Sequence, residues 1–238
     1  LGLLKDLRAC AEAIQREHGL RAVLLTGAGR GFCAGADLTD PEGFPGPGQS
    51  MGQLMASRLR EYYNVVAMLW CRLPCPLVLR QNGLAFGARA SLALMSNKTR
   101  PAKSANLTFV FAPKLGLVPD MGGSYFLARR IGEARARAFA LTGQPIAAEE
   151  AARIGLIAEC VDDAQFESRV REIVGALAAG PRDAFLGVRA LMAAAVTASL
   201  PAQLEAEAAA QARLGDSPDF VEGVTAFREK RAPKFGAR

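Results

Sequence analysis

Hydrophobic positions near the N-terminus recur every three or four residues and are followed by a short, continuous apolar run. The first pattern predicts a helix over residues 3–17, and the run VLLT at 23–26 predicts a buried strand. A glycine-rich loop, GAGRGFCAGADL, comes directly after the strand. Helix, strand and glycine loop in this order indicate the beginning of an α/β protein.

The middle of the chain repeats this alternation of helix and strand. Apolar residues predict a long helix over 51–73, which Pro74 ends, and a second buried strand over 77–79. A run of small residues then predicts a buried helix that starts near Gly87. Residues 107–111 are apolar enough for a further strand.

The last part of the chain is predicted to be nearly all helix. Four segments carry helical patterns: 125–131, 134–141, 147–154 and a final helix that Ser217 and Pro218 cap. One short strand is expected at residues 160–161. The pattern therefore suggests either one large α/β domain or such a domain with a helical piece appended.

Composition narrows the class of protein. The chain has 238 residues, 50% of them hydrophobic, which is enough for one sizeable core. No apolar run reaches the roughly 18 residues of a membrane span, and the charged N-terminal helix is unlike a signal peptide. The five cysteines form no CxxC pair, which argues against a zinc site, and their number and spacing favour a reducing compartment. We expect a soluble, cytoplasmic protein without a metal.

The net charge of +6 favours a polyanionic partner. Nucleic acid, an anionic membrane surface and a phosphate-rich small molecule all fit that charge. Three tyrosines and one tryptophan are few for stacking on single strands, and the basic residues are scattered. A phosphorylated small ligand therefore ranks above nucleic acid.

The glycine loop after the first strand permits three interpretations. Gly29, Gly31 and Ala34 match GxGxxA, the pattern of a dinucleotide site. That pattern must open a long helix, whereas residues 38–41 lead into a loop rich in glycine and proline. Small residues also let backbone N–H groups approach a ligand oxygen, as an oxyanion hole requires. An ordinary glycine-rich turn is the third possibility.

The segment KLGLVPDMGGS, residues 114–124, presents a single carboxylate. Pro119 stiffens the chain before Asp120, and the Gly-Gly pair after it can begin a helix without crowding. This arrangement suits a catalytic acid or base. The segment alone favours a plain turn in which the aspartate caps a helix.

Five motifs in this order resemble the crotonase, or enoyl-CoA hydratase/isomerase, superfamily along almost the whole chain. They are LTGAGRGFCAGADL, PCPLVLRQNGLAFGARASLAL, KLGLVPDMGGSYFLARRIG, LTGQPIAAEEAARIGLIAECV and DFVEGVTAFREKRAPKF. The resemblance implies an α/β fold of stacked ββα turns with a C-terminal helical trimerisation region. It divides the chain into an α/β core over 1–180, without the family's N-terminal hairpin, and a helical oligomerisation region over 181–238. A homotrimer or hexamer is expected.

The resemblance also implies the site residues. The backbone N–H groups of Ala36 and Ala88 match the oxyanion donors for a thioester carbonyl. Ser91 and Ala112 occupy the positions of the two hydratase glutamates, so both carboxylates are absent. Contacts with the acyl-CoA substrate are expected from a larger set: Ala34, Asp37, Leu38, Gly87, Phe227 and Lys230. Coenzyme A enters as part of the substrate, with no other cofactor.

Asp120 matches the acid position of the isomerase branches, including enoyl-CoA isomerases and the ring-epoxide phenylacetyl-CoA isomerases of aromatic degradation. One carboxylate can move a proton within an enolate that an oxyanion hole stabilises. The resemblance thus implies double-bond isomerisation with Asp120 as acid/base. The alternatives are a hydratase in which Asp120 alone activates water, and a catalytically silent acyl-CoA-binding protein.

Several polar residues depart from the family pattern. Arg89 stands where the family keeps glycine beside the oxyanion donor. Charged or polar replacements also occur at five other positions: Arg80, Gln81, Asn97, Lys98 and Arg100. A charge in a buried strand costs several kcal/mol unless it is paired. These residues either recognise a charged acyl group or CoA phosphates, or indicate that the site has drifted.

Overall fold

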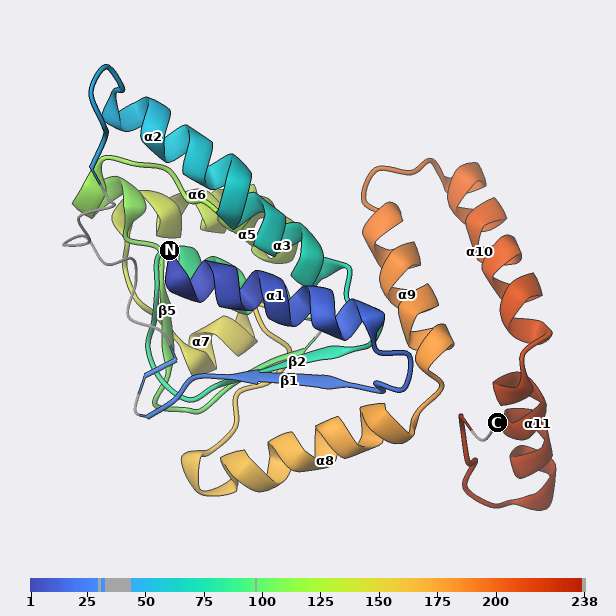
Figure 1. The fold of residues 1–238 in the computed structure, drawn as a ribbon. Coiled ribbons are helices and arrows are strands. Elements are labelled where there is room, and N and C mark those ends of the chain that lie inside the picture. Colours follow the sequence, from blue (N-terminus) through green and yellow to red (C-terminus); the bar gives the residue numbers. More distant parts are fainter. Residues whose placement is uncertain (30, 33–43, 97, 237–238) are drawn as a thin grey trace. The chain divides into compact units, whose positions relative to one another are not determined.

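The computed structural model describes residues 1–29, 31–32, 44–96 and 98–236, with the backbone alone at 98–100. Contacts divide the chain into two compact units (Figure 1). The first contains residues 1–18, 24–73 and 77–170, and the second contains 19–23, 74–76 and 171–238. The boundary near residue 180 and the oligomerising role of the last segment remain predictions.

The strands form two small sheets. In the first, β1 (Val23–Thr26), β2 (Leu77–Gln81) and β4 (Lys98–Pro101) lie in the order β1-β2-β4, and β2 pairs with β4 in parallel. In the second, β3 (Ala85–Phe86) pairs in parallel with β5 (Asn106–Thr108), which pairs antiparallel with β6 (Ile146–Ala147). Along the chain, the strands of both sheets alternate with helices, as expected for an α/β protein.

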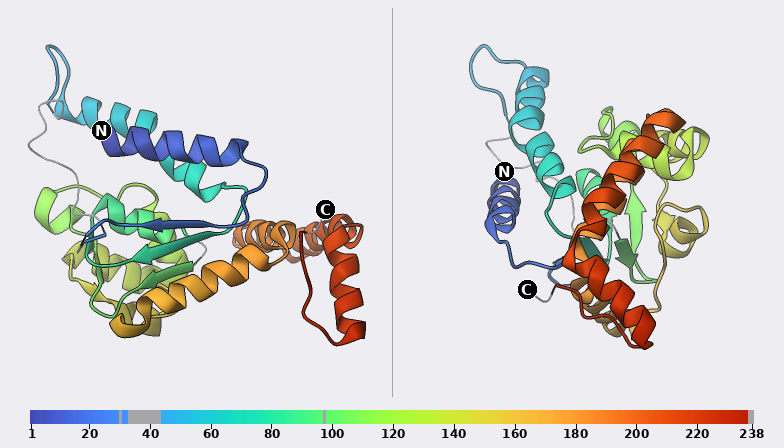
Figure 2. Two further views of the ribbon diagram at one scale, coloured as in Figure 1. Left: turned by 60° about the horizontal axis from the view of Figure 1, so that its bottom comes forward. Right: turned by 90° about the vertical axis from the view of Figure 1, so that its right-hand side faces the viewer.

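A long helical segment and α1 (Gly2–Arg16) lie side by side in the first unit (Figures 1 and 2). The long segment consists of α2 (Met51–Arg58), the π-helical turn η2 (Leu59–Tyr63) and α3 (Asn64–Cys71). The indole Nε1 of Trp70 donates to the carbonyl of Leu7 at 3.0 Å and so joins α3 to α1.

The remaining helices of the first unit surround the second sheet. They are α4 (Ala88–Leu94), the π-helical turn η3 (Phe111–Leu115), α5 (Gly123–Ile131), α6 (Glu133–Thr142), α7 (Ala148–Arg153) and the short η4 (Asp163–Gln165). Apolar residues of α4, α5, α6 and α7 pack with those of the second sheet around Leu94, Leu107 and Phe109, which have no exposed surface. This core holds the turns that precede α4 and α5 in place.

Arg130 on α5 ties three pieces of this unit together. Its guanidinium donates to the carbonyl oxygens of Leu156 at 3.0 Å and Ser96 at 3.3 Å, and to that of Leu94. Burial lowers the pKa of this guanidinium, because the charged form loses solvation. The backbone acceptors offset that loss and connect α5 to the end of α4.

The second unit is helical. It contains most of α8 (Phe166–Ala179), together with α9 (Arg182–Ala194), α10 (Leu200–Gly215) and α11 (Pro218–Glu229). The hydroxyls of Ser199 and Ser217 accept from the N–H groups of Ala202 and Phe220, and a proline stands in the first turn of α10 and α11. Serine followed by proline starts a helix efficiently, which confirms the predicted last helix.

Most elements predicted from the hydrophobic pattern are present. The strand over 23–26 is confirmed with the same bounds, and the helix over 3–17 is confirmed as α1. The helix over 51–73 exists but contains a π-helical turn, and the strand expected at 77–79 extends to Gln81. Lys98–Pro101, which the pattern left unassigned, is a strand because it pairs with β2.

Two predicted strands are wrong in extent. The strand expected over 107–111 ends at Thr108, and Phe111 begins the π-helical turn η3. The strand expected at 160–161 is a single bridge between Val161 and Ala102. Both errors have one cause: an apolar run indicates burial, whereas a strand also needs a partner along its whole length.

Candidate active site

The turn that carries Asp120 has an unusual backbone. Met121 and Gly122 both have positive φ, at 47° and 78°, before α5 begins at Gly123. The N–H of Gly123 donates to the carbonyl of Asp120 at 2.8 Å, which closes the turn. Left-handed geometry costs a residue such as methionine about 1 kcal/mol. Burial of Met121, which is 3% exposed, offsets this cost and holds the turn.

The carboxyl group of Asp120 is set up to exchange a proton. Its Oδ1 is buried and has no hydrogen-bond partner in the described part of the chain. Burial raises its pKa to about 6, although a backbone hydrogen bond at Asp120 itself acts in the opposite direction. An aspartate with this pKa can hold or release a proton near neutral pH, as general acid–base catalysis requires.

Ser91 packs against the same turn. Its side chain on α4 is fully buried, and its Oγ has no hydrogen-bond partner among the described residues. A Cβ added at Gly123 would lie 2.5 Å from this Oγ, so glycine is needed for α4 and α5 to approach. Ser91 thus faces the turn of Asp120 but brings no carboxylate. Ala112, the other hydratase position, lies in η3.

One of the two predicted oxyanion donors can be described. Gly87 has φ 59° and ψ −133°, a conformation suited to glycine, and its N–H donates to the carbonyl of Thr108 at 3.0 Å. Ala88 follows as the first residue of α4. A first-turn N–H has no acceptor within its own helix and is therefore available to a ligand oxygen. The other predicted donor, Ala36, lies outside the described residues, as do Ala34, Asp37 and Leu38.

Tyr63 is a neighbour of the site that sequence reasoning missed. It ends the π-helical turn η2 and is half-buried. Burial raises the pKa of its phenol, and the charge of Asp120 raises it further, whereas Arg58 and Arg89 act in the opposite direction. The phenol of Tyr63 and the carboxylate of Asp120 therefore interact electrostatically. No sequence signal marks the extra residue of a π turn, which often occurs at functional sites.

Arg80 and Gln81 have structural roles. The guanidinium of Arg80 forms an ion pair with Glu167 at 3.0 Å and lies 5.0 Å from the ring centroid of Phe166. The amide of Gln81 donates to the carbonyls of Gly83 at 3.0 Å and Asn106 at 2.8 Å. These contacts explain two replacements that could have indicated drift of the site. Asn97 and the side chains of Lys98 and Arg100 lie outside the description.

Arg89 differs from these two residues. It is half-buried, follows the predicted oxyanion donor Ala88, and makes no hydrogen bond or ion pair within the described part of the chain. Its positive charge lowers the pKa of Tyr63.

The two C-terminal residues of the predicted site lie in the second unit. Phe227 on α11 is 85% exposed, and Lys230 ends that helix with a left-handed backbone. A cavity of about 500 Å³ occurs elsewhere, in the first unit, lined by Lys103, Glu149, Cys160, Asp162 and Arg169 among others. None of the predicted site residues lines it. Within the described residues, no cluster of histidine, cysteine or carboxylate side chains could hold a metal ion, and no helix could span a membrane.

An aspartate with a raised pKa, on a turn that packs against the helix beginning at Ala88, fits enzymes that stabilise an enolate or another oxyanion. The sequence profile described as Enoyl-CoA hydratase/isomerase matches residues 1–238. The chain belongs to this family, within the crotonase superfamily, and the observed fold agrees with that membership.

Individual relatives cover nearly the whole chain. A Rhodobacter capsulatus protein named "Probable enoyl-CoA hydratase" is 44% identical over 227 residues, which are 95% of this chain and 85% of the relative. The 1,2-epoxyphenylacetyl-CoA isomerase of Escherichia coli is 38% identical over 231 residues, or 97% of this chain and 86% of that protein. The crystal structure of an enoyl-CoA hydratase from Bacillus anthracis has a TM-score of 0.87 and 30% identity, covering 98% of this chain and 87% of that one.

Proposed function

We propose that this chain isomerises the double bond of an enoyl-CoA thioester through an enolate, with Asp120 as the acid/base. The supporting observation is the carboxyl group itself: its Oδ1 is buried and lacks a hydrogen-bond partner in the described structure, and its pKa is about 6. A carboxylate of this kind can remove an α or γ proton and return it at the other carbon. The isomerase name of the E. coli relative points in the same direction.

The thioester oxygen would be held by backbone donors. In this proposal the N–H groups of Ala36 and Ala88 stabilise the negative charge of the enolate oxygen. Gly87 lets the chain turn so that Ala88 presents its N–H. Ala34, Asp37 and Leu38 would contact the substrate from the neighbouring loop. Coenzyme A serves only as part of the substrate, and no separate cofactor takes part.

The nucleotide end of CoA would meet α11. Phe227 offers an exposed ring for stacking, and Lys230 offers an ammonium for phosphate. The chain would act as a trimer or hexamer in the cytoplasm. Exposed apolar side chains four residues apart on α9 and α10, at Val188 and Met192 and at Leu200 and Leu204, support assembly through these helices.

A hydratase is the second candidate, because the R. capsulatus relative carries that name. Asp120 would then activate water without a second carboxylate, since Ser91 and Ala112 replace both hydratase glutamates. Adding water across a double bond normally uses a second positioned group, so isomerisation remains the better fit. A silent acyl-CoA-binding protein is the third candidate.

Purified protein incubated with matched 3-enoyl-CoA and 2-enoyl-CoA substrates separates the three candidates. Migration of the double bond from the 3- to the 2-position supports isomerisation. Formation of 3-hydroxyacyl-CoA from the 2-enoyl substrate supports hydration. Acyl-CoA binding without turnover of either substrate supports the silent protein and would refute the proposed reaction.

A further inference from the structure

The end of α11 carries an aromatic ring and an ammonium. Phe227 lies in the last turn, and Lys230, three residues later, is the C-cap that ends the helix. Phe227 is 85% exposed, and Lys230 makes no hydrogen bond or ion pair from its side chain in the described part of the chain. An exposed ring can stack on a purine, and an ammonium without a partner in the protein can bind phosphate.

The backbone of Lys230 is held in an unfavourable conformation. Its φ of 54° and ψ of 38° are left-handed, which costs a residue with a side chain about 1 kcal/mol. Two hydrogen bonds close the helix around it: the N–H of Lys230 donates to the carbonyl of Phe227 at 3.3 Å, and the N–H of Arg231 donates to that of Ala226 at 3.0 Å. Glycine usually occupies such a position. Other contacts must therefore stabilise the turn here.

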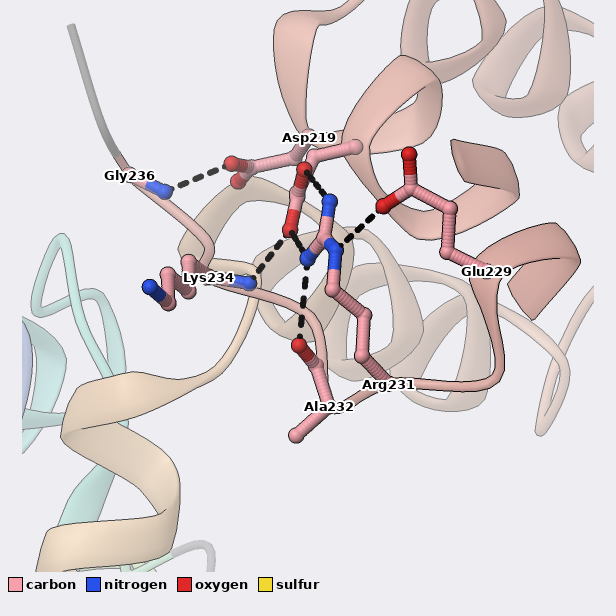
Figure 3. Close-up of polar contacts among 7 residues, drawn as sticks. Asp219, Glu229, Arg231, Ala232, Lys234 and Gly236 are labelled. Carbon is pink, nitrogen blue, oxygen red and sulfur yellow. Dashed lines mark hydrogen bonds and ion pairs between the residues drawn. The ribbon is translucent and has the colours of Figure 1, made fainter. Parts of the chain in front are cut away.

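The side chain of Arg231 supplies those contacts (Figure 3). Its Nη1 and Nη2 donate to the two carboxylate oxygens of Glu222 at 2.6 and 3.0 Å, and its Nε donates to Glu229 at 2.5 Å. A guanidinium that binds a carboxylate through two parallel bonds is both strong and directional. Arg231, the first residue after the left-handed turn, is thereby bound to Glu222 in the middle of α11.

Glu222 and a further carboxylate, Asp219, also hold the chain beyond Arg231. Glu222 accepts the N–H of Lys234 at 2.7 Å, and Asp219 accepts the N–H of Gly236 at 2.7 Å (Figure 3). Arg231, and after it the Lys234 N–H, lower the pKa of Glu222 to about 2, so the carboxylate stays charged at neutral pH. We call this set, Asp219, Glu222, Glu229 and Arg231 with the two N–H groups, the C-terminal clamp.

We propose that Arg231 is a positioning residue for the nucleotide end of CoA. By returning the chain onto α11, the clamp keeps Lys230 in its left-handed conformation and so fixes where its side chain leaves the helix end, three residues after Phe227. Arg231 is paired with Glu222 and Glu229, and the ammonium of Lys230 takes no part in these contacts. The inference rests on the proposed function, which assigns Phe227 and Lys230 to CoA.

The test is Arg231→Met, which keeps the aliphatic length and removes the forked donors. For the 3-enoyl-CoA substrate we expect KM to rise about tenfold, with kcat changed less than about twofold. For the N-acetylcysteamine thioester of the same acyl group, which lacks the nucleotide, KM should stay within about twofold. Glu222→Gln should reproduce the effect from the other side of the clamp. Arg231→Lys, which cannot form the fork, should restore only part of the affinity.

Arg137→Met is the matched control, because Arg137 pairs with Glu133 on the surface of α6 and lies outside the clamp. It should change neither KM. The inference is overturned if Arg231→Met leaves KM for the CoA substrate unaltered, or if it raises KM for both thioesters alike, as a general loss of structure would.

A second experiment tests the role of Arg231 if the protein does not catalyse the proposed isomerisation. If the unaltered protein turns over neither thioester, its affinity for CoA itself is measured by calorimetry, with and without Arg231→Met. An affinity about tenfold weaker in the variant supports the clamp even though the reaction assignment has failed. Equal affinities, or no CoA binding by the unaltered protein, overturn the positioning role of Arg231.

Discussion

Burial of Asp120 links activity to stability at a single residue. The surroundings that raise its pKa to about 6 make it a base of useful strength, yet they also disfavour its charged form. A buried carboxylate oxygen without a hydrogen-bond partner lowers the stability of the folded state, and an aspartate with only a structural role would normally have such a partner. Replacing this residue should therefore affect catalysis and folding in opposite directions.

Asp120→Asn should abolish most of the turnover. If isomerisation is observed, we expect kcat to fall by about 10²- to 10⁴-fold, because an amide cannot take the proton. The measurement is steady-state turnover of 3-enoyl-CoA. Asp6→Asn, at an exposed carboxylate on α1, is the control and should leave kcat unchanged. An Asp120→Asn enzyme with full activity would show that another group moves the proton.

The same variant should be more stable than the unaltered protein at neutral pH. The pKa of Asp120 is near 3.8 in the unfolded chain and about 6 in the folded chain. Between these values the folded state holds one more proton, so its stability falls as pH rises and then stays level above about pH 6. Each pKa unit corresponds to about 1.4 kcal/mol, which limits the effect to about 3 kcal/mol.

Urea unfolding of both proteins from pH 4 to pH 8 measures this difference. The advantage of Asp120→Asn should be small near pH 4, grow up to about pH 6 and not increase further. An advantage that does not vary with pH would mean that the carboxyl is not desolvated in the folded protein.

At the scale of elements, the approach of α4 to α5 decides where Asp120 lies. The contact of Gly123 with Ser91 and Pro119 leaves no room for a side chain at position 123. The positive φ angles of Met121 and Gly122 then direct the chain into α5. A π-helical turn in the long neighbouring helix brings Tyr63 near this turn. Small backbone features thus place the side chains of the site.

Gly123→Ala should destabilise the protein by about 1–3 kcal/mol, because its Cβ would lie 2.5 Å from the Oγ of Ser91. Adding Ser91→Ala removes that oxygen and should recover part of the loss. Thermal and urea unfolding of the single and double variants measure the coupling. Gly175→Ala is the control, since no atom lies within 4 Å of a Cβ added there, and it should be neutral or slightly stabilising. Strictly additive effects of the two substitutions would contradict the contact.

At the scale of the whole molecule, the helices of the second unit leave apolar side chains uncovered. Val188 and Met192 on α9 are 56% and 69% exposed, and Leu200 and Leu204 on α10 are 71% and 54% exposed. Such sets usually lie in an interface. The proposed trimer or hexamer would bury them.

Val188→Glu combined with Met192→Glu should therefore dissociate the assembly. Light scattering after size exclusion should give a mass of about three or six times the 25.2 kDa chain for the unaltered protein, and a smaller mass for the double variant. Leu141→Glu, at a residue of α6 that is 63% exposed, should not change the mass. A monomeric unaltered protein would show that these side chains serve another purpose.

Local patterns determined much of the fold. Three elements could be predicted because residues close together in the sequence favour them. They are α1 from its apolar periodicity, β1 from its uncharged apolar run, and α11 from its serine–proline start. The order of five motifs pointed to the family, and the family profile over the whole chain confirmed it. Asp120 was recognisable because its motif lies in one continuous segment.

The tertiary structure decided what depends on residues far apart in the sequence. Arg80 resembled a misplaced charge until Glu167 and Phe166 proved to be its partners. The length of β5 depended on pairing, and the nearness of Tyr63 to Asp120 depended on a π turn in another helix. The raised pKa of Asp120 follows from burial, and burial is a property of the folded chain. The sequence therefore identified Asp120 as the candidate carboxylate, and only packing decided that its pKa lies near 6.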